Sequence, residues 1–212
     1  MESLYLLLAV HCCVTLLYAA PLPQHDALAR VVERGVSLVK KILNDIPRVH
    51  EAYVKKTGLD LELSSESHDL EYLLSDFGIP APPVLKSISE EFTLAMSLSH
   101  MVEGLDLHHE LLQDIMSSTE TRDSLLADIK ELADQIKEMQ KLVQIPVTVY
   151  KRNLPDFSSR LNSNYKVQVA AHLSLQQLNR FTQAVFRGLR HIANLNQFCA
   201  KPQNLLDKQC VW

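Results

Sequence analysis

The sequence has few glycines, and this scarcity limits the chemistry that the protein can perform. Five glycines occur among 212 residues, and none belongs to a phosphate-binding loop or to a G-x-S-x-G nucleophile elbow. Serine, histidine and aspartate are present, but no spacing between them predicts that they converge in a catalytic site. We therefore expect no enzyme activity, no small-molecule substrate and no cofactor.

A pattern of metal ligands is also absent from the sequence. His108 and His109 are adjacent, so their side chains on a helix point about 100° apart. No cysteine or second histidine follows at i+4 to complete a ligand set, and His100 lies eight residues before the pair. We expect these histidines, like His172 and His191, to be surface or partly packed residues, and we expect no metal site.

The chain carries no excess of positive charge. Its 21 Lys and Arg residues against 25 Asp and Glu residues give a net charge of −4, whereas proteins that bind nucleic acid present a basic surface. Nucleic acid is therefore not an expected partner. The sequence also has no Asn-x-Ser/Thr motif, so N-linked glycosylation is not expected.

One apolar run approaches the length needed to span a membrane. It extends from Leu4 to Ala20 and is followed by Pro21-Leu22-Pro23. The small residues and prolines at its end predict a signal peptide over residues 1–20, and hence a secreted, extracellular protein without stable membrane association. A signal anchor is the alternative, because about 17–20 apolar residues can cross a bilayer.

Cysteine is scarce beyond this run. Cys12 and Cys13 would leave with the signal peptide, so that Cys199 and Cys210 remain. In an oxidising compartment an even pair is expected to form a disulfide. Closing this short loop would contribute about 2–3 kcal/mol, and it would hold the C-terminal tail, residues 198–212, rather than the core.

Helical periodicity fills most of the remaining chain. Apolar residues recur at intervals of three and four, as one face of an amphipathic helix requires, over residues 26–46, 88–117, 121–143 and 162–195. The first two predicted inner faces carry Leu28, Val32, Val36, Val39, Leu43 and Ile46, and Leu94, Leu98, Met101, Leu105, Leu112 and Ile115. The last two carry Leu125, Ile129, Leu132, Ile136, Met139 and Val143, and Val167, Ala171, Leu178, Phe181, Val185, Leu189 and Ile192.

Particular residues predict where these helices begin and end. Pro47 should end or kink the first helix, and the capping box from Ser87 to Glu90 should begin the second. A short helix is expected from His68 to Leu74, before the helix-breaking segment 78–83. Three basic residues should complement the negative end of the last helix; they are Arg187, Arg190 and His191.

The connections between the four predicted helices are long, short and long. They contain about 40, three or four, and about 18 residues. The short link can only reverse the chain direction, whereas about 18 extended residues reach roughly 59 Å, enough to return along a whole helix. The pattern predicts an all-α, long-chain four-helix bundle over residues 21–197, with up-up-down-down order and two long crossover loops.

Four segments of the chain resemble segments of a known protein family, and they occur in the same order and at compatible spacing. They are Gly78-Ile79-Pro80, Leu98–Leu112, Asp123–Glu131 and Ala171–His191. Through them the chain resembles the interleukin-6 and granulocyte colony-stimulating factor family of long-chain helical cytokines. The resemblance implies a secreted growth factor, monomeric when free, that binds and dimerises a class I cytokine receptor and stimulates granulocyte production and activation.

The resemblance also implies two receptor-binding surfaces. The first, on the first and third predicted helices, comprises Arg34, Lys40, Lys41, Asp128 and Glu131. The second comprises Asp69, Tyr72 and Leu161. Ser37 stands where the family has a glutamate, so this contact is either lost or shifted to Glu33. The family has two small disulfides around the first long loop; this chain has none there, so packing of four residues should hold the loop instead: Leu70, Leu73, Leu74 and Phe77.

Three other interpretations fit the same sequence. The charged residues of the first and third helices are compatible with a solvated face, or with ion pairs worth about 0–1 kcal/mol when exposed. Another interleukin-6-class cytokine with a different receptor would show the same pattern. A secreted lipid-binding protein also has amphipathic helices, although usually with wide apolar faces, repeats and short links.

Overall fold

The computed structural model describes residues 23–54, 61–63, 68–147 and 156–199. Its long helices are α2 (Pro23–Tyr53), α4 (Leu94–Ile115), α5 (Glu120–Leu142) and α7 (Asn164–Cys199), and its shorter helices are α3 (His68–Phe77) and α6 (Phe157–Arg160). The described residues contain no strand, so this part of the chain is all-α. The expected signal peptide, residues 1–20, and Cys210 lie outside it.

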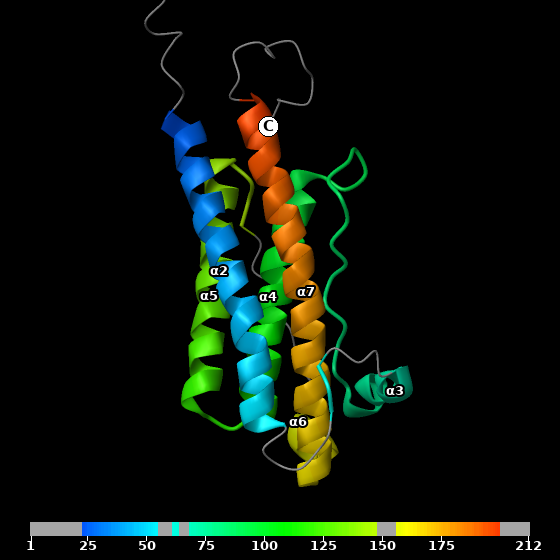
Figure 1. The fold of residues 1–212 in the computed structure, drawn as a ribbon. Helices are drawn as coiled ribbons and strands as arrows, with labels where there is room; N and C mark the ends of the chain where they lie inside the picture. Colours follow the sequence, from blue (N-terminus) through cyan, green and yellow to red (C-terminus); the bar gives the residue numbers. More distant parts are fainter. Residues whose placement is uncertain (1–22, 55–60, 64–67, 148–155, 200–212) are drawn as a thin grey trace, which may run out of the picture.

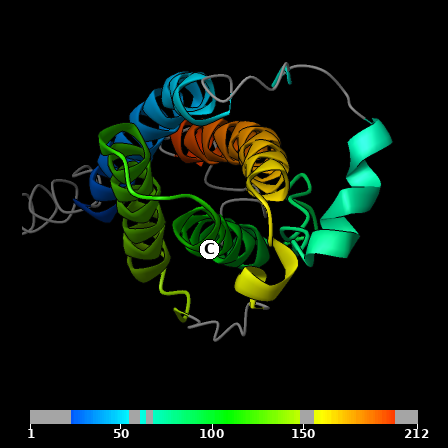
Figure 2. The same ribbon diagram turned by 90° about the horizontal axis from the view of Figure 1, so that it is seen from below.

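The four long helices lie side by side around a common interior (Figure 1, Figure 2). α2 packs against α5 and α7, and α4 packs against the same two helices. α3 lies outside this group, at the lower end in the view of Figure 1, where it contacts α6 and α7. The architecture is therefore a helical bundle with a short helix on its outside.

The apolar faces predicted from periodicity fill the interior. All the predicted residues of α4 are buried, and so are most of those on the other three helices. The exceptions are half-buried: Val36, Leu43, Val143 and Val167. Val31 and Ile42 are buried without having been predicted, because α2 faces two neighbours and its buried stripe is wider than one row of residues.

The sequence predicted that Pro47 would end or kink the first helix, and the helix does not end there. α2 continues through Pro47 to Tyr53. The turn beyond the proline is buried, with Val49 and His50 each 2% exposed, and the His50 ring bonds His172 of α7 at 2.8 Å. These contacts offset the loss of the backbone hydrogen bond that a proline cannot donate.

The second helix begins later than predicted. The segment Ser87–Glu90 does not cap it; instead the Ser89 hydroxyl accepts a hydrogen bond from the Phe92 backbone N–H at 3.1 Å, closing a turn. α4 begins at Leu94, and the side chain of its N-cap, Thr93, accepts from the backbone N–H of Met96. Phe92, at the end of this turn, is buried, and its ring centroid lies 5.4 Å from that of His100 on α4.

The link between α4 and α5 is as short as predicted, since it comprises residues 116–119. The hydroxyl of Thr119 caps α5 by accepting from the backbone N–H of Arg122 at 3.2 Å. The backbone N–H of Ser117 donates to the Tyr53 hydroxyl at 3.3 Å, which ties the link to the end of α2. α5 begins and ends within one residue of its predicted bounds.

The predicted short helix in the first connection is present, and it extends beyond Leu74 to Phe77. It ends at Gly78, whose φ of 74° lies in the left-handed region that glycine adopts without strain. The N–H groups of Gly78 and Ile79 bond the carbonyls of Ser75 and Leu74 at 3.0 and 2.8 Å, as in a Schellman motif.

Packing holds α3 and the segment after it against the bundle. Phe77 and Ile79 are buried, and Leu73 and Leu74 are half-buried against the core. This agrees with the role expected for these leucines and for Phe77. The side chain of Leu70 lies outside the described part of the chain.

The last helix begins where predicted and ends four residues later than predicted. The Ser163 hydroxyl accepts from the backbone N–H of Lys166 at the start of α7, which continues to Cys199 instead of ending at residue 195. α6 was not predicted; its Phe157 is buried. Within the described ranges, none of the helices combines the length and the apolar character that crossing a membrane requires.

Candidate functional site

A hollow of about 580 Å³ lies on the outer face shared by α2 and α5. It is lined by residues of both helices: Arg30, Glu33, Arg34, Ser37, Leu38, Lys41, Glu131 and Gln135. Three of the residues proposed from the sequence, Arg34, Lys41 and Glu131, therefore meet at one concave surface. Lys40 is exposed on α2 but is not part of the lining.

Asp128, which was expected to face a partner, is buried beside Lys41. The Lys41 ammonium donates to the Asp128 carboxylate at 2.7 Å, and the two side chains are 55% and 7% exposed. This hydrogen bond raises the pKa of Lys41 above its usual value, although partial desolvation acts in the opposite direction. Asp128 is thus placed to hold Lys41 at the edge of the hollow, while Lys41 faces the solvent.

The charges around the hollow have both signs. Arg34 and Lys41 come from α2, while Glu131 lies on α5 and is exposed. Glu33 lines the same hollow, so a carboxylate is present one turn before Ser37, where the sequence suggested a shifted contact. Such a mixed rim suits recognition of a partner surface of complementary charge, which sets association rate and specificity.

The second predicted surface lies where α3 meets α6 and α7. Tyr72 of α3 is 64% exposed, whereas Leu161, between α6 and α7, is half-buried against the core. Asp69 is in the first turn of α3, and its side chain is outside the described part. Because α3 packs against α6 and α7, these residues come to the same end of the bundle.

Tyr165 also lies at this end of the bundle, and it was not predicted from the sequence to be a binding residue. It lies in the first turn of α7 and is 56% exposed. Exposed tyrosines are enriched among residues that anchor protein interfaces. The sequence did contain a sign of this exposure: Tyr165 directly follows the capping residues 162–164 and lies outside the apolar periodicity of α7.

Two histidines that were expected to be surface or partly packed residues are fully buried. His108 packs against the Phe181 ring, with 5.5 Å between ring centroids, and His172 bonds His50. Burial, and then the neighbouring His50, lower the pKa of His172 to about 4. Both rings thus lie in the packing between helices. Among the described residues there is no group of three potential metal ligands.

The described residues form a helical bundle that carries the proposed binding residues on two surfaces. No protein-family model matches the chain. The chain is similar to granulocyte colony-stimulating factor of Bos taurus, with 29% identity over 131 residues that make up 59% of this chain. It spans 65% of the length of that relative. The similarity is therefore to a colony-stimulating factor, over part of each chain.

Proposed function

We propose that this protein is a secreted helical cytokine that binds a class I cytokine receptor and brings two receptor chains together. The observation that supports this most is the set of contacts between the helices, taken with the similarity to a colony-stimulating factor. By analogy with that relative, the biological outcome is granulocyte production and activation. The acting part is residues 21–197, released from the signal peptide 1–20 and monomeric when free.

Contacts of α2 support the up-up-down-down order. Along α2, Gly35 lies against Met139 of α5 and Leu189 of α7. Farther on, Lys41 pairs with Asp128, and His50 bonds His172. As the numbers rise along α2 they fall along both neighbours, which is the pattern of a helix that runs opposite to α5 and α7.

Contacts of α4 follow the same rule. Ser99 accepts a hydrogen bond from Gln140 at 3.2 Å, and Asp106 pairs with Lys137 at 3.7 Å. Gly104 lies against Phe181 of α7. Met101 of α4 and Gly188 of α7 also touch, so numbers rise along α4 as they fall along α5 and α7. These contacts support a bundle in which α2 and α4 share one direction, with residues 54–93 and 143–163 as the crossovers.

The mechanism that we propose is binding geometry. One receptor chain binds the hollow between α2 and α5 through Arg34, Lys41 and Glu131, with Lys40 beside it and Asp128 acting through Lys41. A second receptor chain binds the end of the bundle at Asp69, Tyr72 and Leu161. The packed bundle fixes the distance between the two surfaces, so that the bound chains are held close enough to signal. The Cys199–Cys210 disulfide would hold the tail outside this bundle.

A binding experiment tests the proposal. Purified protein is titrated onto immobilised ectodomains of the colony-stimulating factor receptor and of other interleukin-6-class receptors, and receptor-associated phosphorylation is followed in cells that carry them. Saturable binding and phosphorylation with the first receptor are expected. Response with a different receptor of the panel would assign another cytokine of the class. No binding to any of them, together with flotation on liposomes, would favour the lipid-binding alternative and discard the proposal.

A further inference from the structure

The last helix of the bundle is positively charged although the whole chain is negative. Between Asn164 and Cys199, α7 contains no aspartate or glutamate, while the chain carries a net charge of −4. Its upper half presents Arg187, Arg190 and His191, all exposed. Positive charge is therefore gathered locally on a protein that as a whole would repel anions.

The sequence suggested that these cations stabilise the negative end of α7. The structure does not place them there. The helix ends at Cys199 and has no basic residue in its last turn, so His191 and Arg190 lie more than two turns before the end. The favourable interaction of a cation with the helix dipole is confined to about the last turn. Another reason is needed for their position.

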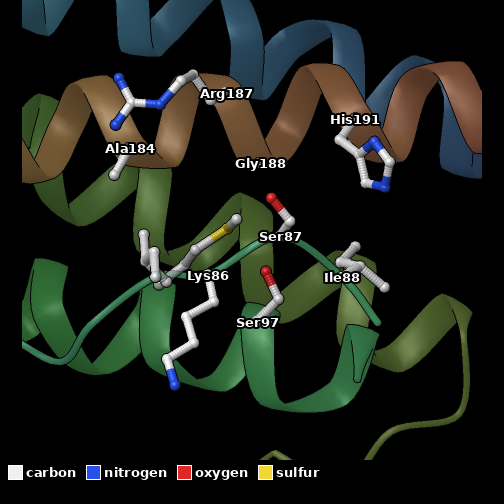
Figure 3. Close-up of a pocket in the computed structure, with 10 residues that line it drawn as sticks. Lys86, Ser87, Ile88, Ser97, Ala184, Arg187, Gly188 and His191 are labelled. Atoms are coloured by element: carbon white, nitrogen blue, oxygen red, sulfur yellow. The ribbon is translucent and has the colours of Figure 1, made fainter. Parts of the chain in front are cut away.

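A pocket of about 280 Å³ lies beside them, between α4, α7 and the segment that precedes α4. Its lining comes from all three: Leu85, Lys86, Ser87, Ile88, Ser97, Met101, Ala184, Arg187, Gly188 and His191. None of these residues is acidic, and three carry or can carry positive charge. Figure 3 shows Arg187 and His191 on either side of Gly188, with Lys86 extending over the α4 side.

Hydroxyl groups supply the polar interior of the pocket. The side-chain oxygens of Ser87 and Ser97 point into the space between α4 and α7 in Figure 3. Ser97 is 1% exposed, so its hydroxyl lies at the protected inner side of the pocket. Gly188 contributes bare backbone there, because a Cβ at this position would overlap Met101.

We propose that this pocket, together with Arg190 beyond it, binds a sulfated polysaccharide. A sulfate group accepts hydrogen bonds from hydroxyls such as Ser87 and Ser97, and guanidinium groups such as Arg187 bind tetrahedral oxyanions through paired N–H donors. This site is distinct from both receptor surfaces, so it stands or falls independently of the proposed function.

The size and shape of the site favour a polymer over a single ion. The pocket volume corresponds to roughly nine water molecules of liquid, more than one inorganic sulfate fills. Arg190 lies three residues beyond Arg187, about 4.5 Å farther along the axis, and its guanidinium sits 5.7 Å from the centre of the Phe186 ring. A chain with repeated sulfate groups can fill the pocket and follow this row.

A nucleic acid fits the site less well. Single-stranded nucleic acids bind by stacking bases on exposed aromatic rings as well as by charge. The largely exposed aromatic residues of the described chain, Tyr72 and Tyr165, are on α3 and in the first turn of α7, away from this pocket. The lining of the pocket contains no aromatic ring other than His191.

The test compares charge variants of the full protein by calorimetric titration with a heparin oligosaccharide of defined length. Arg187→Gln should weaken binding about tenfold, or about 1.4 kcal/mol, and higher salt should weaken it further. The matched control, Lys130→Gln, removes the same charge from the exposed face of α5 and should change affinity by less than about twofold. Equal weakening by the two variants would overturn the proposal, since it would indicate an effect of net charge alone.

Ser97→Ala tests the pocket itself because it leaves the charge unchanged. Weaker binding by about threefold or more, with unaltered circular dichroism, is expected from the loss of one hydrogen bond. If this variant does not fold, Ser87→Ala in the exposed segment replaces it. Unchanged binding would place the ligand elsewhere. Equal affinity for desulfated oligosaccharide, or tighter binding of single-stranded DNA, would also overturn the assignment.

Discussion

At the scale of single residues, burial decides which charged groups of α2 and α5 can reach a partner. Asp128 and Glu131 are one turn apart on α5, yet the Asp128 side chain is 7% exposed and paired with Lys41, while Glu131 is exposed at the hollow. The sequence presents the two carboxylates as equivalent. The structure assigns them different roles, because Lys41 lies across the helix interface from only one of them.

Reversing the charge of Glu131 should therefore weaken receptor binding. Glu131→Arg replaces a carboxylate with a further cation beside Arg34 and Lys41, and we expect a loss of more than about 1.4 kcal/mol, or tenfold in affinity, with unchanged helical content. Surface plasmon resonance with the receptor ectodomain measures this. Glu138→Arg makes the same change on an exposed part of α5 outside the hollow and should bind normally; equal affinities of the two variants would refute this face.

Asp128 should act on binding through Lys41 and not directly. Lys41→Met and Asp128→Asn should each weaken receptor binding, and the double variant should lose no more than the larger single loss, because both changes remove the same oriented ammonium. A double-mutant cycle measures this coupling. Additive losses would instead mean that Asp128 contacts the partner by itself.

The buried His172 should make stability depend on pH. Its pKa is lowered to about 4 in the folded state, against about 6.5 when unfolded, so the unfolded chain binds a proton more readily between these values. Above pH 6.5, His172 should not lower the free energy of unfolding. As the pH drops toward 4, the free energy of unfolding should fall by up to about 3 kcal/mol. Urea titrations over this range should show a flatter profile for His172→Gln; an identical slope in both proteins would contradict the assignment.

At the scale of helices, close approach depends on a few glycines. Gly104 is costly within a helix, and the structure gives the reason for it, because the Phe181 ring of α7 occupies the space that a side chain would take.

The type of the helices and their inner faces could be predicted from the periodicity of apolar residues. The ends followed less well. Burial of His50 beyond Pro47 involves His172, which is distant in sequence, and a turn closed by Ser89 and Phe92 stands where the second helix was expected to begin.

Gly104→Ala should destabilise the bundle. The added methyl group overlaps a rigid ring, and overpacking of this kind costs about 1–3 kcal/mol, which offsets the gain of about 1 kcal/mol from replacing a helical glycine. Gly35→Ala is the matched control, because its Cβ would lie 3.0 Å from the flexible end of Met139. Chemical unfolding should rank Gly35→Ala above Gly104→Ala; the reverse order would be unexpected from this packing.

At the scale of the whole molecule, the proposed function depends on two surfaces held by one body. Glu131→Arg at the hollow and Tyr72→Ala at the α3 end should each leave the other surface able to bind. Each variant should therefore form a complex with one receptor chain but fail to bridge two, as light scattering of mixtures with the soluble ectodomain would reveal. Bridging by both variants at the wild-type concentration would be incompatible with two separate sites.

The sequence by itself determined the helix type, most of the inner faces and the short link between α4 and α5, because periodicity and capping depend on residues close together in the chain. The tertiary structure decided what depends on distant neighbours. It buried Asp128 against Lys41, carried α2 through Pro47, and placed Ser87, Ser97 and Arg187 around one pocket. Such placements follow from how whole helices pack, since side chains far apart in sequence meet only once the helices are packed.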